Sequence, residues 1–226
     1  MRKNLVCRTL AYQIIFFVLF WTTSVYAAPW DVEYWQYFYM QNGAVGSWKF
    51  YTVAEMRLNR DLRHPYYFRI TENAAYRVYA DLDLEGHYSF ICNKSRGSPA
   101  FRQTHRLEIE INPQISRNQT TLKWRNRIEF LKKQFKPGIQ YVFRHRTLIL
   151  FSLKNWKYLQ SISCSDEVFY DLQLHKFTQN RLIPLSATFA INKKASLEVF
   201  FMIRNFFGFN SFKWYRSFAF GGQLHF

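Results

Sequence analysis

The chain has 226 residues, of which 49% are hydrophobic and 20% aromatic, with 24 Phe, 15 Tyr and 7 Trp. This apolar content excludes a disordered chain, and the small numbers of Gly and Pro (8 and 6) exclude collagen-like and low-complexity classes. The length indicates about one domain, and the formal net charge of +16 bears on partners more than on fold.

The first 27 residues have the organisation of an export signal. Bases in residues 2–8 precede an apolar stretch over residues 10–21, which is short for a membrane helix, and residues 25–27 (Val-Tyr-Ala) provide small residues for cleavage. We therefore predict a signal peptide over residues 1–27 and one barrel domain over residues 28–226. An uncleaved membrane anchor is the alternative interpretation.

From residue 28 onward, apolar and polar residues alternate with a period of two, which is typical of β-strands. In residues 121–132, Leu122, Trp124, Ile128 and Phe130 share one face, and Lys123, Arg125, Arg127 and Glu129 share the other, with Asn126 as the exception. Eleven segments show such a pattern: 34–41, 47–58, 66–78, 83–92, 102–115, 120–132, 139–153, 160–172, 179–191, 196–207 and 213–226.

Most of these segments are longer than the five or six residues typical of globular strands, and they reach the ~9–11 residues that a tilted strand needs to cross a bilayer. The sequence therefore predicts an all-β fold, an antiparallel transmembrane barrel of the outer-membrane type. Because bacterial single-chain barrels have an even number of strands, we expect ten or twelve strands. The segment 34–41 is then a plug, or a strand whose partner is not recognised.

The connections predict an orientation. With the C-terminus in the periplasm, the short turns 42–46, 79–82, 116–119 and 192–195 are periplasmic, and the longer connection 93–101 lies outside. Aromatic residues near strand ends suit the two interfacial girdles of such a barrel. They are Trp48, Tyr66, Tyr67, Trp124, Tyr141, Trp156, Tyr158, Trp214 and Tyr215.

The last segment carries a C-terminal pattern. Phe218, Phe220, Gly222 and Leu224 precede the final Phe226 at even spacing. This pattern resembles the signal by which bacterial outer-membrane barrels are recognised for assembly. We therefore predict location in the cell outer membrane, with outer-membrane lipids and the assembly machinery as partners, and we expect no nucleic-acid partner despite the basic charge.

Several short motifs resemble an uncharacterised family, domain of unknown function 2490. They are Trp124-Arg125-Asn126-Arg127-Ile128-Glu129, Asp166-Glu167-Val168-Phe169, Phe177-Thr178-Gln179-Asn180-Arg181-Leu182 and Leu197-Glu198-Val199. The resemblance runs from about Trp35 to the end of the chain, although Pro184 and Leu185 stand where small residues and Gly are more usual. It implies an outer-membrane barrel and no particular activity.

The polar face carries acids and bases in nearly equal numbers, which predicts ion pairs inside the barrel. The residues predicted for this lumen network are Arg57, Arg69, Arg77, Glu108, Glu110, Arg125, Arg127, Glu129, Arg144, Arg146, Glu167, Arg181, Glu198 and Arg204. Two interpretations remain open: a structural lattice that fills a narrow lumen, or a pore whose residual positive charge favours small anions. A lumen of ten or twelve strands allows either.

An enzyme is not predicted. His87 and Ser89 share the inward face with Asp83 and Glu85, but residues two apart on a strand lie about 6.5 Å apart, too far for direct proton transfer. Asp83, Glu85 and His87 could form a metal site, but the interpretation that they are simply part of a polar lumen is stronger. We therefore assign no catalytic residue, metal or cofactor. The alternatives are an outer-membrane lipid-modifying hydrolase and a secreted barrel that binds a hydrophobic ligand.

Overall fold

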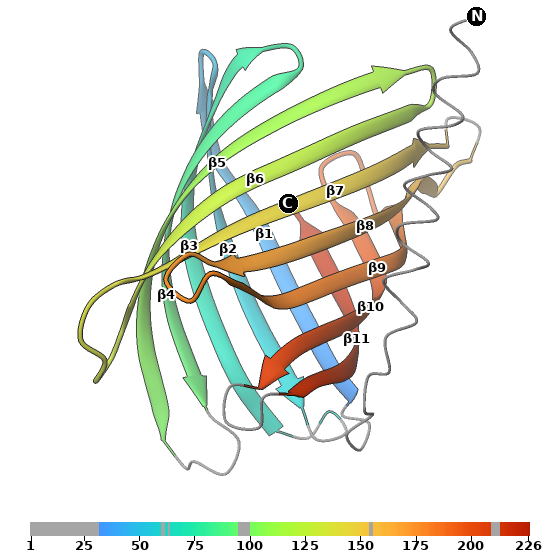
Figure 1. The fold of residues 1–226 in the computed structure, drawn as a ribbon. Helices are drawn as coiled ribbons and strands as arrows, with labels where there is room; N and C mark the ends of the chain where they lie inside the picture. The colour runs from blue at the N-terminus through green and yellow to red at the C-terminus, as the bar shows by residue number, and fades with distance from the viewer. Residues whose placement is uncertain (1–31, 60–61, 63, 95–99, 154–155, 209–212) are drawn as a thin grey trace, which may run out of the picture.

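The structure is a computed structural model that describes residues 32–59, 62, 64–94, 100–153, 156–208 and 213–226. It contains eleven strands (Figure 1): β1 (Val32–Val45), β2 (Trp48–Asn59), β3 (His64–Tyr79), β4 (Leu82–Lys94), β5 (Phe101–Arg117), β6 (Thr120–Lys133), β7 (Gln140–Ser152), β8 (Leu159–Asp171), β9 (Lys176–Ala190), β10 (Ser196–Gly208) and β11 (Lys213–His225). The predicted signal peptide lies outside the described residues.

The strands form one closed barrel in which each strand pairs with its neighbours in sequence, all of them antiparallel. The first and last strands close the barrel as a parallel pair, from Val32 opposite Phe218 to Tyr39 opposite His225. Beyond this ladder, the Phe226 amide donates to the Tyr39 carbonyl (N···O 2.9 Å), which extends the contact to the last residue.

The expectation of ten or twelve strands is therefore wrong, because the barrel has eleven. An even count follows only when the first and last strands run in opposite directions. Here they run in the same direction, and parallel strands can also pair through regular hydrogen bonds. The segment 34–41 is neither a plug nor a strand without a partner, since it forms most of β1 and pairs on both edges.

Tight turns connect several hairpins at one end of the barrel. β1 and β2 are joined at Gly46, and β5 and β6 at Asn118, each with a φ of +57°. Two-residue hairpin turns require such positive φ values, which Gly and Asn adopt more readily than other residues. The turns predicted at 42–46, 79–82, 116–119 and 192–195 all lie at this end, although β1 continues to Val45.

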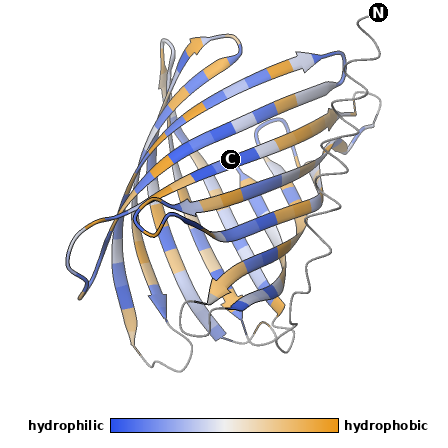
Figure 2. Cartoon of the chain, in the orientation of Figure 1, coloured by the Kyte–Doolittle hydropathy of each residue, from blue (hydrophilic) through white to orange (hydrophobic). Residues whose placement is uncertain are grey.

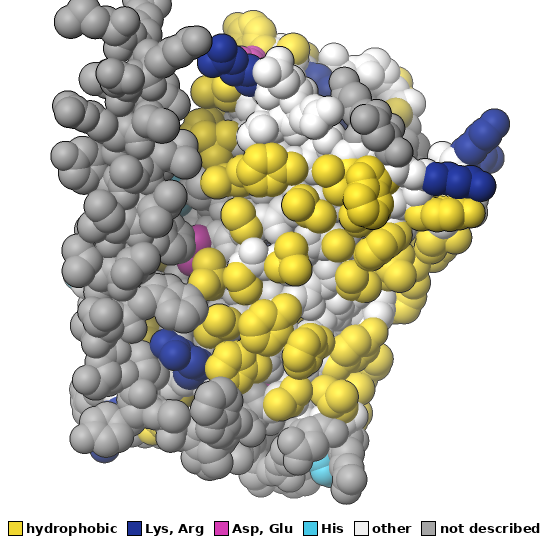
Figure 3. Space-filling model, turned by 90° about the vertical axis from the view of Figure 1, so that its right-hand side faces the viewer, with side chains coloured by type: hydrophobic (Ala, Val, Ile, Leu, Met, Phe, Trp, Pro, Cys, Tyr) yellow, Lys and Arg dark blue, Asp and Glu magenta, His cyan; other side chains and the backbone are white. Residues whose placement is uncertain are grey.

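The two faces of the wall have opposite character, and hydropathy alternates along most strands in Figure 2. On β5, Ile109 is 56% exposed on the outer face, whereas its neighbours Glu108 and Glu110 are only 1% and 2% exposed on the inner face. Figure 3 shows hydrophobic side chains spread over one side of the barrel, with Lys and Arg mostly at its margins. In the described part of the chain, no helix has the length and apolar composition to cross a bilayer.

The inner face also contains a small apolar cluster of Trp35, Phe200, Met202 and Ala219, from β1, β10 and β11. Gly221 makes this packing possible, because a Cβ there would overlap the Phe200 ring and lie 2.5 Å from the Trp35 carbonyl oxygen.

Two of the aromatics predicted for the girdles contact groups on the inner face instead. Tyr67 lines the lumen beneath the Arg57 guanidinium (4.0 Å to the ring centroid), and the Tyr66 hydroxyl donates to Glu33 (2.6 Å). The pairing of β2 with β3 shifts between Arg57 and Leu58. Such an irregularity changes which face a side chain meets, and alternation alone does not reveal it.

A row of polar side chains, interrupted by Val168 on β8, crosses the outer face of β6 to β11. Asn126 lies directly opposite His145, and farther along the same row Asn180, Asn205 and Arg216 follow on successive strands. Neighbours in the row share hydrogen bonds, such as His145 Nδ1 with Asn126 Oδ1 (2.8 Å) and Arg216 Nε donating to Asn205 Oδ1 (3.0 Å). Lateral pairing therefore satisfies polar groups that interrupt an otherwise apolar surface.

Candidate functional site

The largest charged cluster lies inside the barrel and connects five successive strands. It joins acids and arginines of β5 to β9: Arg106, Glu108, Glu110, Arg125, Arg127, Glu129, Arg144, Glu167 and Arg181. We call this set the central network. Glu129 contacts arginines of three strands, among them Arg106 (3.6 Å) and Arg127 (3.4 Å).

Most of the central network is shielded from solvent. The side chains of Arg127, Arg144, Glu108 and Glu129 are each at most 8% exposed. Removing charges from water costs several kcal/mol per ion, roughly, and this cost is offset only where the ions meet partners with good geometry. Because each carboxylate of the network meets at least one guanidinium, the charges hold neighbouring strands of the wall together.

Two smaller groups lie beside it. Glu55 on β2 bridges Arg57 (2.5 Å) and Arg69 (2.8 Å), with its own side chain fully buried. Near the start of β1, Glu33 accepts hydrogen bonds from Trp35 (2.7 Å) and Arg204 (3.0 Å). Glu33 was not among the predicted network residues, because it precedes the alternating segment that begins at residue 34.

Other predicted network residues lie elsewhere. Arg77 pairs with Asp83 (2.8 Å) at a more exposed position, and Glu198 accepts a hydrogen bond from Ser186 instead of pairing with a base. Arg146 faces the lumen without a salt bridge to any described carboxylate. Its neighbours directly across the sheet are Arg125 on β6 and Glu167 on β8, so two guanidiniums lie side by side with one carboxylate next to them.

The lumen contains a cavity of about 660 Å³ whose lining includes residues from all eleven strands. Arg125, Arg146 and Lys123 border it from β6 and β7. Like charges directly opposite on a sheet are destabilising, and of these two guanidiniums only that of Arg125 forms a salt bridge with Glu167 (2.5 Å). This part of the lining therefore carries a local excess of positive charge.

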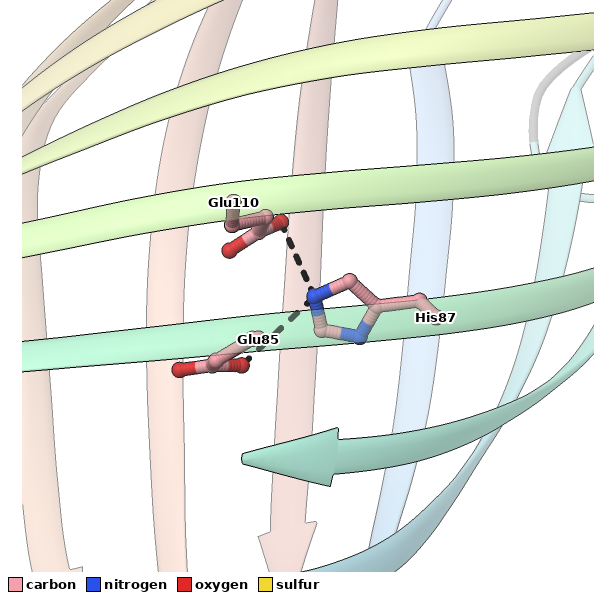
Figure 4. A group of neighbouring side chains, drawn as sticks. All are labelled: Glu85, His87 and Glu110. Carbon is pink, nitrogen blue, oxygen red and sulfur yellow. Dashed lines mark ion pairs between the residues drawn. The ribbon is translucent and has the colours of Figure 1, made fainter. Parts of the chain in front are cut away.

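On another part of the lining, His87 lies between two carboxylates (Figure 4). Its Nε2 is 3.5 Å from Glu85 on the same strand, β4, and 3.3 Å from Glu110 on β5. Glu85 also accepts hydrogen bonds from Tyr51 (2.6 Å) and Asn112 (2.8 Å). Asp83, which sequence spacing groups with Glu85 and His87, pairs with Arg77 instead. The third residue of the cluster around His87 is Glu110, which comes from the neighbouring strand β5.

The C-terminal residues lie where β11 meets its two neighbours. Phe218, Phe220 and Leu224 are opposite Ile203, Phe201 and Leu197 of β10, and Gly222 is opposite Val199. Phe220 is about half exposed, and Phe226 follows the strand at the seam with β1. Recognition of this segment by an assembly machinery stays a prediction.

The comparisons with known proteins concern the family alone. The model of a family described as protein of unknown function (DUF2490) matches residues 32–216, which includes β1 to β10 and the start of β11. The chain belongs to this family, and it is an all-β protein with a closed barrel fold. Neither the curated proteins nor the solved structures include a match.

Proposed function

We propose that this chain is an integral outer-membrane β-barrel of a Gram-negative bacterium, with a narrow lumen that favours small anions. The observation that carries the proposal is the distribution of side chains over the barrel wall, which is the reverse of that in a water-soluble protein. Large apolar side chains such as Ile70, Ile109 and Phe220 are more than half exposed, while acids and arginines fill the inside. Exposed apolar surface on this scale marks contact with lipid or with a partner.

Strand length supports the same conclusion. The strands have between 12 and 17 residues, enough to cross a bilayer at a tilt of about 45°. A closed barrel also leaves no unpaired edge, as the hydrocarbon core of a membrane requires. A secreted barrel for a hydrophobic ligand needs the reverse arrangement, with an apolar lumen and a polar outer surface.

The lumen supports a restricted passage. Eight strands leave room for little more than side chains, and sixteen leave an aqueous channel, so eleven strands give an intermediate width. The central network lines the lumen along β5 to β9, and a cavity of about 660 Å³ remains. The excess of positive charge at Lys123, Arg125 and Arg146 would favour anions, since rings of Arg and Lys select them.

The location is tested on the full chain expressed with its own N-terminus. We expect the protein in the outer-membrane fraction after carbonate washing, and faster gel migration of the unheated than of the heated sample in detergent. In planar bilayers we expect small conductance steps and a reversal potential that indicates anion preference. Release by carbonate would refute the membrane location. Absence of conductance from correctly folded protein would remove the channel and leave a structural role.

A further inference from the structure

The cluster of Glu85, His87 and Glu110 brings two carboxylates close together, and the described residues provide a Lys or Arg partner for only one of them. Glu85 and Glu110 are directly opposite each other on the inner face of β4 and β5. Arg127 contacts Glu110, but no Lys or Arg in the described chain forms a salt bridge with Glu85. Two carboxylates opposite each other repel, so a cation between them would stabilise the pair.

His87 points into the space between these carboxylates, and its tautomer follows from Asn73. The Asn73 amide nitrogen donates to the carbonyls of Tyr51 (2.9 Å) and Thr71 (3.0 Å), so Oδ1 is the atom that meets His87. An amide oxygen only accepts, and therefore Nδ1 of His87 carries the proton. Among the described residues, Nε2 forms no well-aligned hydrogen bond, its nearest neighbours are carboxylate oxygens of Glu110 and Glu85, and the His87 side chain is 97% buried.

Nε2 is therefore the nitrogen that can bind a metal ion, and it points toward two carboxylate oxygens. A histidine that binds a metal through one nitrogen usually donates a hydrogen bond from the other nitrogen to a neighbouring oxygen. Asn73 provides that oxygen for His87. Hydrogen bonds from Tyr51 and Asn112 orient the Glu85 carboxylate in the same way.

The separations fit a small divalent ion. Four ligands at ~2.0–2.1 Å from a tetrahedral Zn²⁺ lie about 3.3–3.4 Å from one another. The Nε2 separations from Glu110 and Glu85 are 3.3 and 3.5 Å, and all three ligand atoms lie within 4.8 Å of one another.

We propose that Glu85, His87 and Glu110 form a binding site for a divalent first-row transition metal, with Zn²⁺ as the best match to this mixed nitrogen and oxygen donor set. All three residues line the cavity, which leaves a fourth coordination position open to water or a solute. Arg127 does not prevent binding, because it also contacts Glu108 (2.8 Å) and Glu129 (3.4 Å) and those contacts can retain it.

The test is a titration of the full-length folded protein, without a polyhistidine tag, with Zn²⁺ and separately with Co²⁺. We expect one equivalent of Zn²⁺ per chain and a Co²⁺ visible absorption typical of tetrahedral coordination. His87→Gln should weaken Zn²⁺ binding by more than ~100-fold, and Asn73→Ala, which removes an outer partner, by ~10–100-fold. Folding of each variant is verified by its heat-modifiable migration.

Two further variants make the outcome decisive. Glu85→Gln should lose binding without leaving a guanidinium unpaired, so it replaces His87→Gln if that variant does not fold. His105→Gln is the matched control, because His105 is outward-facing on β5 and contacts Tyr88 (2.7 Å) away from the cluster. Equal Zn²⁺ affinity in the wild type and Glu85→Gln would overturn the proposal, as would equal loss in His105→Gln. Neither result would bear on the membrane location.

Discussion

Glu167 on β8 shows how single residues stabilise the inside of this barrel. Its carboxylate is nearly inaccessible and contacts Arg125 (2.5 Å), Arg144 (2.9 Å) and Arg181 (3.8 Å), which come from three other strands. The Arg144 and Arg181 guanidiniums also lie over the Phe169 ring, at 4.2 and 4.5 Å from its centroid. One acid thus holds several long side chains in one arrangement.

Neutralising this acid is expected to be costly. Glu167→Gln leaves buried guanidiniums without their counter-charge, and we expect a loss of about 3–5 kcal/mol in the free energy of unfolding. The measurement is urea unfolding of the refolded protein in detergent. Asp83→Asn is the matched control, because its pair with Arg77 is partly exposed and should contribute only ~0–1 kcal/mol. Similar losses for the two variants would contradict a central role of Glu167.

At the scale of elements, the parallel pairing of β1 with β11 decides whether the wall is closed. The remaining neighbours are hairpins, and their pairing follows from short connections. The seam between β1 and β11 joins segments at opposite ends of the chain, and no short connection specifies its register. Its register rests on eight residue pairs and on packing of the Phe200 ring over Gly221.

A disulfide can test this seam. Phe38 lies directly opposite Leu224, so Phe38→Cys with Leu224→Cys should cross-link on mild oxidation once the natural cysteines are replaced by Ser. The control is Phe38→Cys with Gly222→Cys, two residues away along β11, where the Cα atoms are about 8 Å apart and a disulfide is not expected. Mass spectrometry of the folded protein measures both. A cross-link in the control alone would show a different register.

At the scale of the whole molecule, the distribution of charge in the lumen sets the solute preference that we propose. Acids and arginines largely offset each other in the central network, so the net field in the cavity depends on lining groups without such a partner among the described residues: the acids Glu85 and Glu198, and the bases Lys123, Lys133 and Arg146. Arg146 is the clearest of these, since it faces Arg125 across β6 and β7. Basic residues in the turns lie far from the lumen and contribute little once salt screens them.

Arg146→Glu should therefore reduce or reverse the anion preference of the channel. The measurement is the reversal potential under a KCl gradient in planar bilayers. Lys194→Glu changes the charge by the same amount in the turn between β9 and β10, and it should leave the reversal potential nearly unchanged. If both variants shift it equally, net charge and not the lumen lining controls selectivity.

Much of the wall was predictable from alternation. The segment predicted at 120–132 is β6 at residues 120–133, and the one at 196–207 is β10 at residues 196–208. Along a strand, successive side chains point to opposite faces, so residues two positions apart share a face. The assignment of Glu108 and Glu110 to one side therefore follows directly. The resemblance to the DUF2490 family was likewise readable from short motifs, and the family match confirms it.

The even-number rule failed because it concerns how barrels usually close, which a local pattern does not encode. The sequence by itself determined eleven alternating segments, their approximate limits and the composition of each face, because side chains alternate along any extended strand. Only the tertiary structure decided that β1 and β11 pair in parallel and that His87 meets Glu110 and not Asp83. Those contacts depend on strand register, which joins residues distant in the chain.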